Sequence, residues 1–129
     1  MTTPFDDPQA ELAWMFLQSL CGEGDLDEGF ELLSDDFTHW SIVTGTTVGK
    51  VALRKMVEQR QRRLARLEIN LMGCINSGET VVIEGEVDGA TADGAPYDTP
   101  FVCIVDTRDG VIVSIRQYSD TRQTAELFG

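Results

Sequence analysis

The second half of the chain contains two pairs of β-forming segments, and each pair is joined by a short polar turn that contains a glycine. The pairs are residues 68–75 with 80–88, and residues 100–107 with 111–118. Glycine-bearing turns between alternating apolar and polar residues are typical of β-hairpins. The pattern therefore predicts four consecutive antiparallel strands, with residues 89–98 as the loop between the two hairpins.

The first half of the chain has mainly helical periodicity. Apolar residues recur every three or four positions over residues 8–21, 26–33 and 50–67, and these are the predicted helices. Residues 37–43 are rich in β-formers and are predicted to form a strand. The expected order is α-α-β-α-β-β-β-β. Helices segregated from an antiparallel meander define an α+β fold.

The predicted helix over residues 50–67 has an apolar face and a basic face. Leu53, Met56 and Val57 are expected to point inward. The basic residues are expected to lie mostly outward and to pair with nearby acids. They are Arg54, Lys55, Arg60, Arg62, Arg63 and Arg66.

Length and charge narrow the class of protein. A chain of 129 residues matches one domain, predicted to cover residues 1–129, that buries a core without disulfides or metals. Its net charge of −12 repels nucleic acid and anionic membranes, so neither is an expected partner. Three widely spaced cysteines, and no basic or apolar leader in residues 1–7, favour a cytoplasmic protein with reduced thiols.

Three segments, in their order and spacing, resemble the SnoaL-like and ketosteroid isomerase-like branch of the nuclear transport factor 2-like superfamily. They are GVIVSIRQYSD at 110–120, LSDDFTHW at 33–40, and DGAPY at 93–97 leading to Phe101. The resemblance implies a cone: a curved antiparallel sheet wrapped on the N-terminal helices, with an apolar cavity between the sheet and the first helix. It also implies a homodimer formed through the sheet face.

Several functions fit this resemblance, because the fold carries many chemistries. The first is a cofactor-independent isomerase, dehydratase, cyclase or hydrolase that acts on a small apolar molecule by acid/base catalysis. The second is a non-catalytic binder of such a molecule, and the third is a protein-interaction module. No cofactor is expected, and one histidine without a CxxC pair argues against a zinc site.

The resemblance and strand alternation together suggest site residues. His39, the only histidine, shares a strand face with Ser41 and can take or give a proton near neutral pH. Similarity to ketosteroid isomerases puts Ser41 at their general-base aspartate. Similarity to limonene epoxide hydrolases puts Glu84 and Glu86 near that family's inward arginine and aspartate, and Gln117 at its second aspartate. The catalytic candidates are therefore His39, Glu84 and Glu86, and Ser41 and Gln117 are candidates for ligand binding.

The orientation of the two glutamates stays open in the sequence. If Glu84 and Glu86 point into the cavity, their mutual repulsion raises the pKa of one carboxyl group and suits it to acid/base work. If the opposite face, with Val81 and Ile83, forms the core, the glutamates face water or a partner subunit. Trp14 and Tyr97 are further ligand-binding candidates, and Tyr97 can supply a phenol donor.

Overall fold

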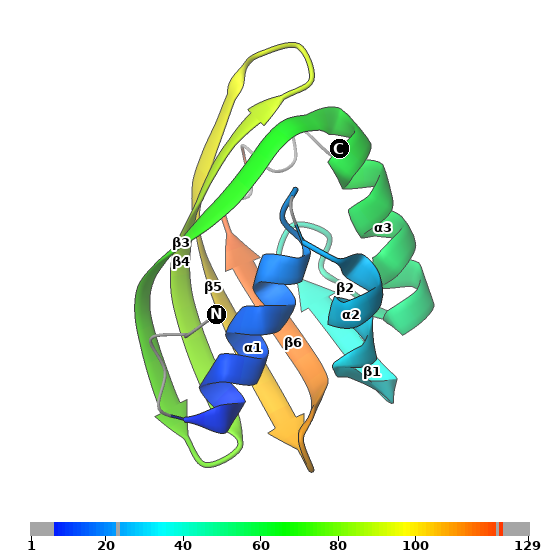
Figure 1. Cartoon of the computed structure of the whole chain (residues 1–129), viewed down its shortest axis with the longest axis vertical. Helices are drawn as coiled ribbons and strands as arrows, with labels where there is room; N and C mark the ends of the chain where they lie inside the picture. The colour runs from blue at the N-terminus through cyan, green and yellow to red at the C-terminus, as the bar shows by residue number, and fades with distance from the viewer. Residues whose placement is uncertain (1–6, 23, 121, 123–129) are drawn as a thin grey trace.

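The described residues of the computed structural model, 7–22, 24–120 and 122, form three helices and six strands (Figure 1). The elements are α1 (Pro8–Ser19), α2 (Leu26–Glu31), β1 (Leu33–Ser41), β2 (Thr46–Gly49), α3 (Lys50–Arg63), β3 (Leu64–Ser77), β4 (Thr80–Thr91), β5 (Pro96–Arg108) and β6 (Val111–Ser119). The predicted α+β fold and its order are confirmed, with β2 as one additional short strand. The expected lack of a leader concerns residues that lie mostly outside this part of the chain.

Aspartates begin the first two helices. Asp7 precedes Pro8, and its Oδ1 accepts a hydrogen bond from the Ala10 N–H at 2.9 Å. Asp25 does the same for the N–H groups of Asp27 and Glu28. Such caps satisfy donors that have no partner within the helix. No helix among residues 7–22, 24–120 and 122 is long and apolar enough to cross a membrane.

The boundary between α3 and β3 differs from the prediction. The helix ends at Arg63, and Leu64 is already extended, with φ −114° and ψ 132°. The prediction of helix to residue 67 was wrong because apolar residues at 64 and 67 fit a helical stripe equally well. Pairing with β4 decides the outcome, since Leu64 is in register with Thr91 and Leu67 with Gly89. Tertiary pairing thus overrides local periodicity.

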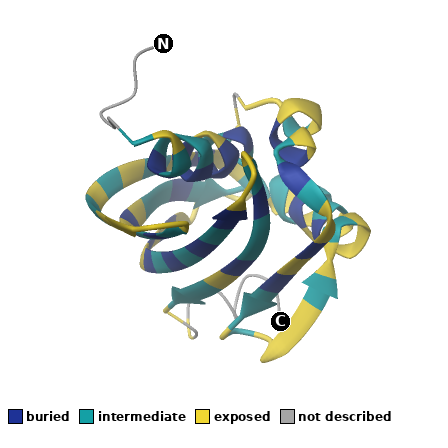
Figure 2. Cartoon of the chain, turned by 90° about the horizontal axis from the view of Figure 1, so that it is seen from below, coloured by how far each residue is buried: buried dark blue, intermediate teal, exposed yellow. Residues whose placement is uncertain are grey.

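The six strands form one sheet in the order β2-β1-β6-β5-β4-β3. All neighbours are antiparallel except β1 and β6, which run parallel. The register shifts in β1–β6, β3–β4 and β5–β6, and such irregularities increase local bending. The sheet curves, and α1 lies across its concave face (Figure 1). Buried and exposed residues alternate along the curved strands (Figure 2).

The core lies between the concave face and the helices. Val81 and Ile83 of β4 are fully buried, and Phe101 of β5 is 6% exposed. Phe16 of α1 makes an edge-on ring contact with Phe30 of α2, at 5.6 Å between centroids. Large side chains therefore fill the space under α1. The space between α3, β1 and the end of β6 is less completely filled, and the candidate site lies in this space.

Candidate functional site

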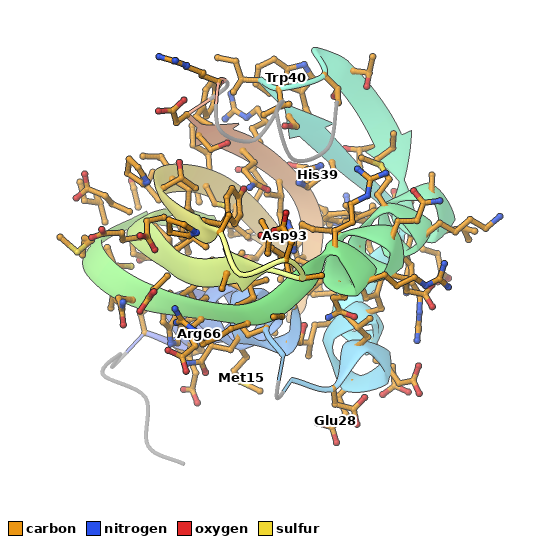
Figure 3. The ribbon with its side chains drawn as sticks, turned by 90° about the horizontal axis from the view of Figure 1, so that it is seen from above. Met15, Glu28, His39, Trp40, Arg66 and Asp93 are labelled. Atoms are coloured by element: carbon orange, nitrogen blue, oxygen red, sulfur yellow. The ribbon has the colours of Figure 1, made fainter. Side chains whose placement is uncertain are left out.

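Strand alternation places His39 inside the cone. On β1, Phe37 and His39 are buried, whereas Thr38 between them is exposed. Only 8% of His39 is exposed. Figure 3 shows Trp40 at the outer margin of the sheet and His39 nearer to α3 and the interior. The prediction that His39 and Ser41 share a face agrees with this pattern.

Gln117 of β6 holds the imidazole of His39. The His39 Nε2–H donates a hydrogen bond to Gln117 Oε1 at 3.1 Å. Gln117 is in register with Ser41 of β1 and Cys103 of β5, so three strands meet at this point. With its proton on Nε2, the neutral ring keeps a lone pair on Nδ1 that can accept a proton.

Burial keeps His39 neutral at physiological pH. Burial is the largest influence and lowers the pKa of His39 below the ordinary value of 6.5. The Gln117 hydrogen bond opposes it by favouring the protonated ring, and the positive charge of Arg60 lowers the pKa further. A neutral imidazole in an apolar site is ready to act as a base.

Arg60 is a cavity-lining residue that the sequence interpretation missed. It was expected to lie outward, but it lines the interior, and its Nε is shielded from solvent without a hydrogen-bond partner. The signal was present, because Arg60 follows the buried Leu53 and Val57 by seven and three positions and therefore shares their helix face. The sequence interpretation placed Arg60 at the surface because its side chain is charged. Burial lowers the pKa of the Arg60 guanidinium, yet a guanidinium stays protonated in proteins.

Two adjoining chambers open onto these residues. The larger, of about 190 Å³, lies between α1, α3, β1 and β6, and the smaller, of about 50 Å³, lies between α1, β3, β4 and β5. No aspartate or glutamate of the described residues lines either chamber. Most of the lining is aliphatic or aromatic. The residues that line both chambers are Leu17, Leu20, Arg60, Gln117 and Ser119.

The other predicted ligand-binding residues divide between cavity and core. Ser41 lines the larger chamber, Tyr97 the smaller one, and Gln117 both. Trp14 is buried in the hydrophobic core and is not among the residues that line either chamber. Cys103 lines the smaller chamber, where burial raises the pKa of its thiol to about 12. Cys103 is therefore a packing residue rather than a nucleophile.

Glu84 and Glu86 lie on the opposite face of the sheet. Both are exposed, whereas Val81 and Ile83 of the same strand are buried. The structure therefore does not bring the glutamates together with His39, and their placement in the cavity is corrected. The physical reason is that a strand keeps its aliphatic face in the core and leaves charged groups in water, which was the second possibility given by the sequence.

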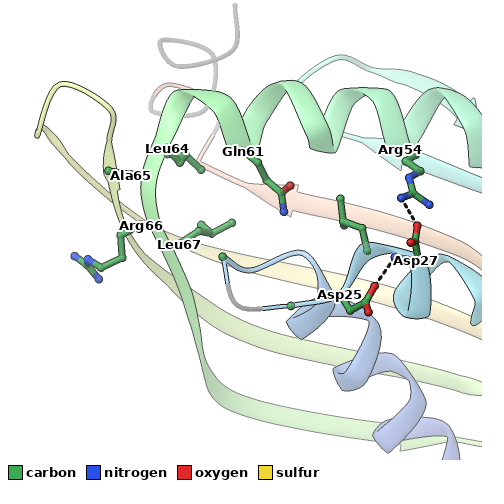
Figure 4. A pocket seen from close by; sticks show the side chains of 11 residues that line it. Asp25, Asp27, Arg54, Gln61, Leu64, Ala65, Arg66 and Leu67 are labelled. Atoms are coloured by element: carbon green, nitrogen blue, oxygen red, sulfur yellow. Dashed lines mark hydrogen bonds and ion pairs between the residues drawn. The ribbon is translucent and has the colours of Figure 1, made fainter.

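A separate open groove lies between α2, α3 and β3 (Figure 4). Its polar groups already have partners. Asp27 pairs with Arg54, Asp25 caps α2, and Gln61 donates to the Leu20 carbonyl oxygen at 3.2 Å. Because these interactions hold the helices together, we assign no chemistry to the groove. Among the described residues, no cluster of three or more histidine, cysteine or acidic side chains could hold a metal.

Comparison with known proteins identifies the family. The model of the SnoaL-like domain matches residues 15–115, and the chain belongs to this family. A search of curated proteins finds no match.

Solved structures share the fold. A proposed SnoaL-like polyketide cyclase from Jannaschia sp. CCS1 has a TM-score of 0.81 and 17% identity, covering 99% of this chain and 96% of that one. A protein with a ketosteroid isomerase-like fold from Catenulispora acidiphila, in complex with trimethylamine, has a TM-score of 0.78 and 18% identity, covering 99% of this chain and 95% of that one. An LEH-like epoxide hydrolase from M. tuberculosis has a TM-score of 0.76 and 18% identity over 94% and 89%. At these identities the likeness establishes the fold alone.

Proposed function

We propose that this protein is a cofactor-independent enzyme that transfers a proton within a small, largely apolar molecule bound in the two chambers, with His39 as the base. The observation that carries the proposal is the hydrogen bond between the buried His39 and the half-buried Gln117, with 3.1 Å between Nε2 and Oε1. A buried neutral imidazole held by a fixed acceptor, beside an apolar cavity, is suited to general base catalysis.

The proposed chemistry needs only the side chains of this site. His39 Nδ1 removes a proton from a carbon or hydroxyl of the substrate. Gln117 Oε1 then stabilises the imidazolium, because its hydrogen bond favours the protonated ring. The imidazolium returns the proton to another atom of the same molecule or to a leaving oxygen. The first outcome is an isomerisation and the second is an elimination or ring opening, and neither needs an oxidant or a reductant.

Deuterium exchange tests this proposal without a known substrate. Small aromatic and alicyclic ketones and 2-keto acids are incubated with the protein in D₂O, and loss of their acidic C–H signals is followed by NMR. The wild type is expected to accelerate exchange for at least one probe. His39→Gln is expected to lose roughly 10²–10⁴-fold of that acceleration. Thr38→Ala, an exposed neighbour on the same strand, is the matched control. A His39→Gln protein with wild-type exchange would refute the role of His39.

A non-catalytic binder is the second candidate. The lack of carboxylates among the described residues that line the cavity favours it. So do Ser41 and Gln117, which stand where the resemblance places aspartates of related enzymes. A binder would show saturable thermal stabilisation by a probe and no exchange of that probe's protons. Exchange that depends on His39 would exclude it.

The outer face of the sheet is proposed to form a homodimer. Val82, Val102 and Ile104 are half-buried there, and the rings of Trp40 and Tyr118 lie 5.2 Å apart. Light scattering is expected to give the mass of a dimer, because apolar sheet faces are covered in stable assemblies. Ile104→Glu is expected to give a monomer. Val51→Glu, an exposed position on α3, serves as the control. A monomeric wild type at micromolar concentration would contradict the proposal.

A further inference from the structure

We infer that the ligand of this cavity is a small apolar carboxylate, and that Arg60 binds its carboxylate group at the junction of the two chambers. The inference deepens the proposed function and rests on it in one respect only, that the cavity is the ligand site. It names the chemical class of the ligand. It also names a binding residue that neither the resemblance nor the comparisons assign.

The first argument is the distribution of charge. The chain has 22 acidic and 10 basic side chains, so a random lining would be rich in carboxylates. The described lining holds none, and its charged side chains are Arg60 and Arg63. An acidic protein with a positively charged cavity attracts anions to that cavity and repels cations from it.

The second argument is the partner that Arg60 lacks. Arg54, Arg66 and Arg108 pair with carboxylates at the surface. Within residues 7–22, 24–120 and 122, no carboxylate lies within ion-pair distance of Arg60, and its shielded Nε donates to nothing. A shielded N–H group without a hydrogen-bond partner is costly, and proteins seldom keep one without a use. The planar guanidinium matches a carboxylate through two parallel hydrogen bonds.

The third argument is position. Arg60 and Gln117 line both chambers, so an anion on Arg60 would lie at their junction. The apolar part of the ligand would then occupy the larger chamber, against Leu53, Val57 and Ile115. Its volume of about 190 Å³ is below the roughly 300–1,000 Å³ of typical drug-sized sites, which restricts the ligand to a small molecule.

Arg60 and His39 also lie close enough for one ligand to contact both. The charge of Arg60 influences the titration of the His39 ring, and both side chains line the larger chamber. A carboxylate held by Arg60 would place the neighbouring carbon near the base. The guanidinium would also stabilise the negative charge that develops when His39 removes a proton. One residue thereby supplies both binding and charge stabilisation.

The test compares benzoate with benzamide, which has nearly the same shape and no charge. Affinity is measured by calorimetry, and the site is identified from the NMR signal of the only histidine. Benzoate is expected to bind at least about tenfold more tightly than benzamide, because hydrogen bonds to charged groups are the stronger ones. Bound benzoate is also expected to raise the pKa of His39. Equal binding of the two probes, no binding of either, or preferential binding of trimethylamine, a cation at neutral pH, would overturn the inference.

Variants assign the effect to Arg60. Arg60→Gln is expected to lose about 10–100-fold in benzoate affinity, because it removes a charged hydrogen-bond pair. Arg62→Gln removes the same charge from an exposed position of α3 outside both chambers, and it is expected to retain benzoate affinity within about twofold. Arg60→Lys keeps the charge without the planar fork, so an intermediate loss is expected. Equal losses in Arg60→Gln and Arg62→Gln would overturn the inference.

Two further measurements separate this inference from its alternatives. Arg60→Met is expected to raise the melting temperature, because it removes a shielded N–H donor that has no partner. A large fall would show that Arg60 is structural and would overturn the inference. His39→Gln is expected to keep benzoate binding while losing proton exchange. Failure of exchange with binding intact would refute only the proposed catalysis, and failure of binding with exchange intact would refute only the carboxylate site.

Discussion

Polar side chains on the two faces of the curved sheet differ in their exposure to solvent and in how many hydrogen bonds they make. On the outer face, Glu84 and Glu86 stand in water, and the half-buried Asp106 accepts hydrogen bonds from Thr80 and Ser114 at 2.8 Å each. On the inner side, His39 is buried with one amide partner, and the Arg60 Nε has none. The outer groups are satisfied by solvent or neighbours, whereas the inner groups retain unused hydrogen-bonding capacity.

This difference shows how to choose among candidate catalytic residues. The outer face offers the chemically more conventional pair, two carboxylates two positions apart on one strand. The inner side offers a histidine and an arginine from elements separated in sequence, β1 and α3. His39 and the Arg60 Nε are shielded from water, where charge interactions are stronger and pKa values are shifted. The location of a group relative to the core therefore decides more than its chemical type.

The largest expected contrast comes from replacing the candidate catalytic side chains of each face in turn. The Glu84→Gln/Glu86→Gln double variant is expected to keep proton exchange within about twofold, whereas His39→Gln loses roughly 10²–10⁴-fold. Both proteins are expected to fold, since neither change creates a cavity or buries a charge. Exchange rates in D₂O, with circular dichroism as the folding control, make the comparison. If the double variant folds but loses more than tenfold in proton exchange rate, the outer glutamates take part in catalysis.

A smaller contrast concerns two glycines on neighbouring strands. At Gly85, a Cβ atom would lie 2.5 Å from the ring of Phe101 on the inner face. At Gly73, the nearest atom is Oε1 of the exposed Glu84, at 3.4 Å. Gly85→Ala is therefore expected to lower the free energy of unfolding by about 1–3 kcal/mol through overpacking. Gly73→Ala should stay within about 0.5 kcal/mol of the wild type. Urea unfolding measures both, and equal losses would show that the inner face is not the tightly packed one.

Sequence reasoning reached the fold because its signals are local and repeated. Turn glycines, strand alternation and helical stripes each recur along the chain, and the SnoaL-like motifs fix their order. The short strand β2 was missed because its residues, Thr46–Gly49, carry no apolar alternation. Its existence depends on pairing with β1, where Thr38 is in register with Gly49. Such pairing is not visible in a local window.

The site was only partly predictable for a related reason. His39, Ser41, Tyr97 and Gln117 line the chambers, and strand alternation and the resemblance had pointed to His39, Ser41 and Gln117. Arg60 was missed because its charge was given more weight than its helical spacing. The helical period of about 3.6 residues decides whether a position on a helix faces the core. A charged residue at a core-facing position is therefore a stronger sign of function than an apolar one.

The smallest expected effect is a pH dependence of stability that arises from the inner side alone. The pKa of His39 is lowered in the folded protein, mainly by burial, from an ordinary value of 6.5. Below pH 6.5 the unfolded chain therefore binds more protons at this residue, so the free energy of unfolding decreases as the pH falls. Between pH 7.5 and 5.5 the loss from His39 is at most about 1.4 kcal/mol.

Denaturant unfolding across this pH range distinguishes the contribution of His39 from that of the surface acids. His39→Gln retains the carboxylates and lacks the imidazole, so its stability should fall less than that of the wild type. Arg60→Met removes the positive charge that lowers the pKa of His39, so its pH dependence should lie between the two. Glu84→Gln/Glu86→Gln should follow the wild type, because both residues lie in water on the outer face. If His39→Gln and the wild type lose stability in parallel, the imidazole is solvated in solution, and the contrast between the two faces fails at its central residue.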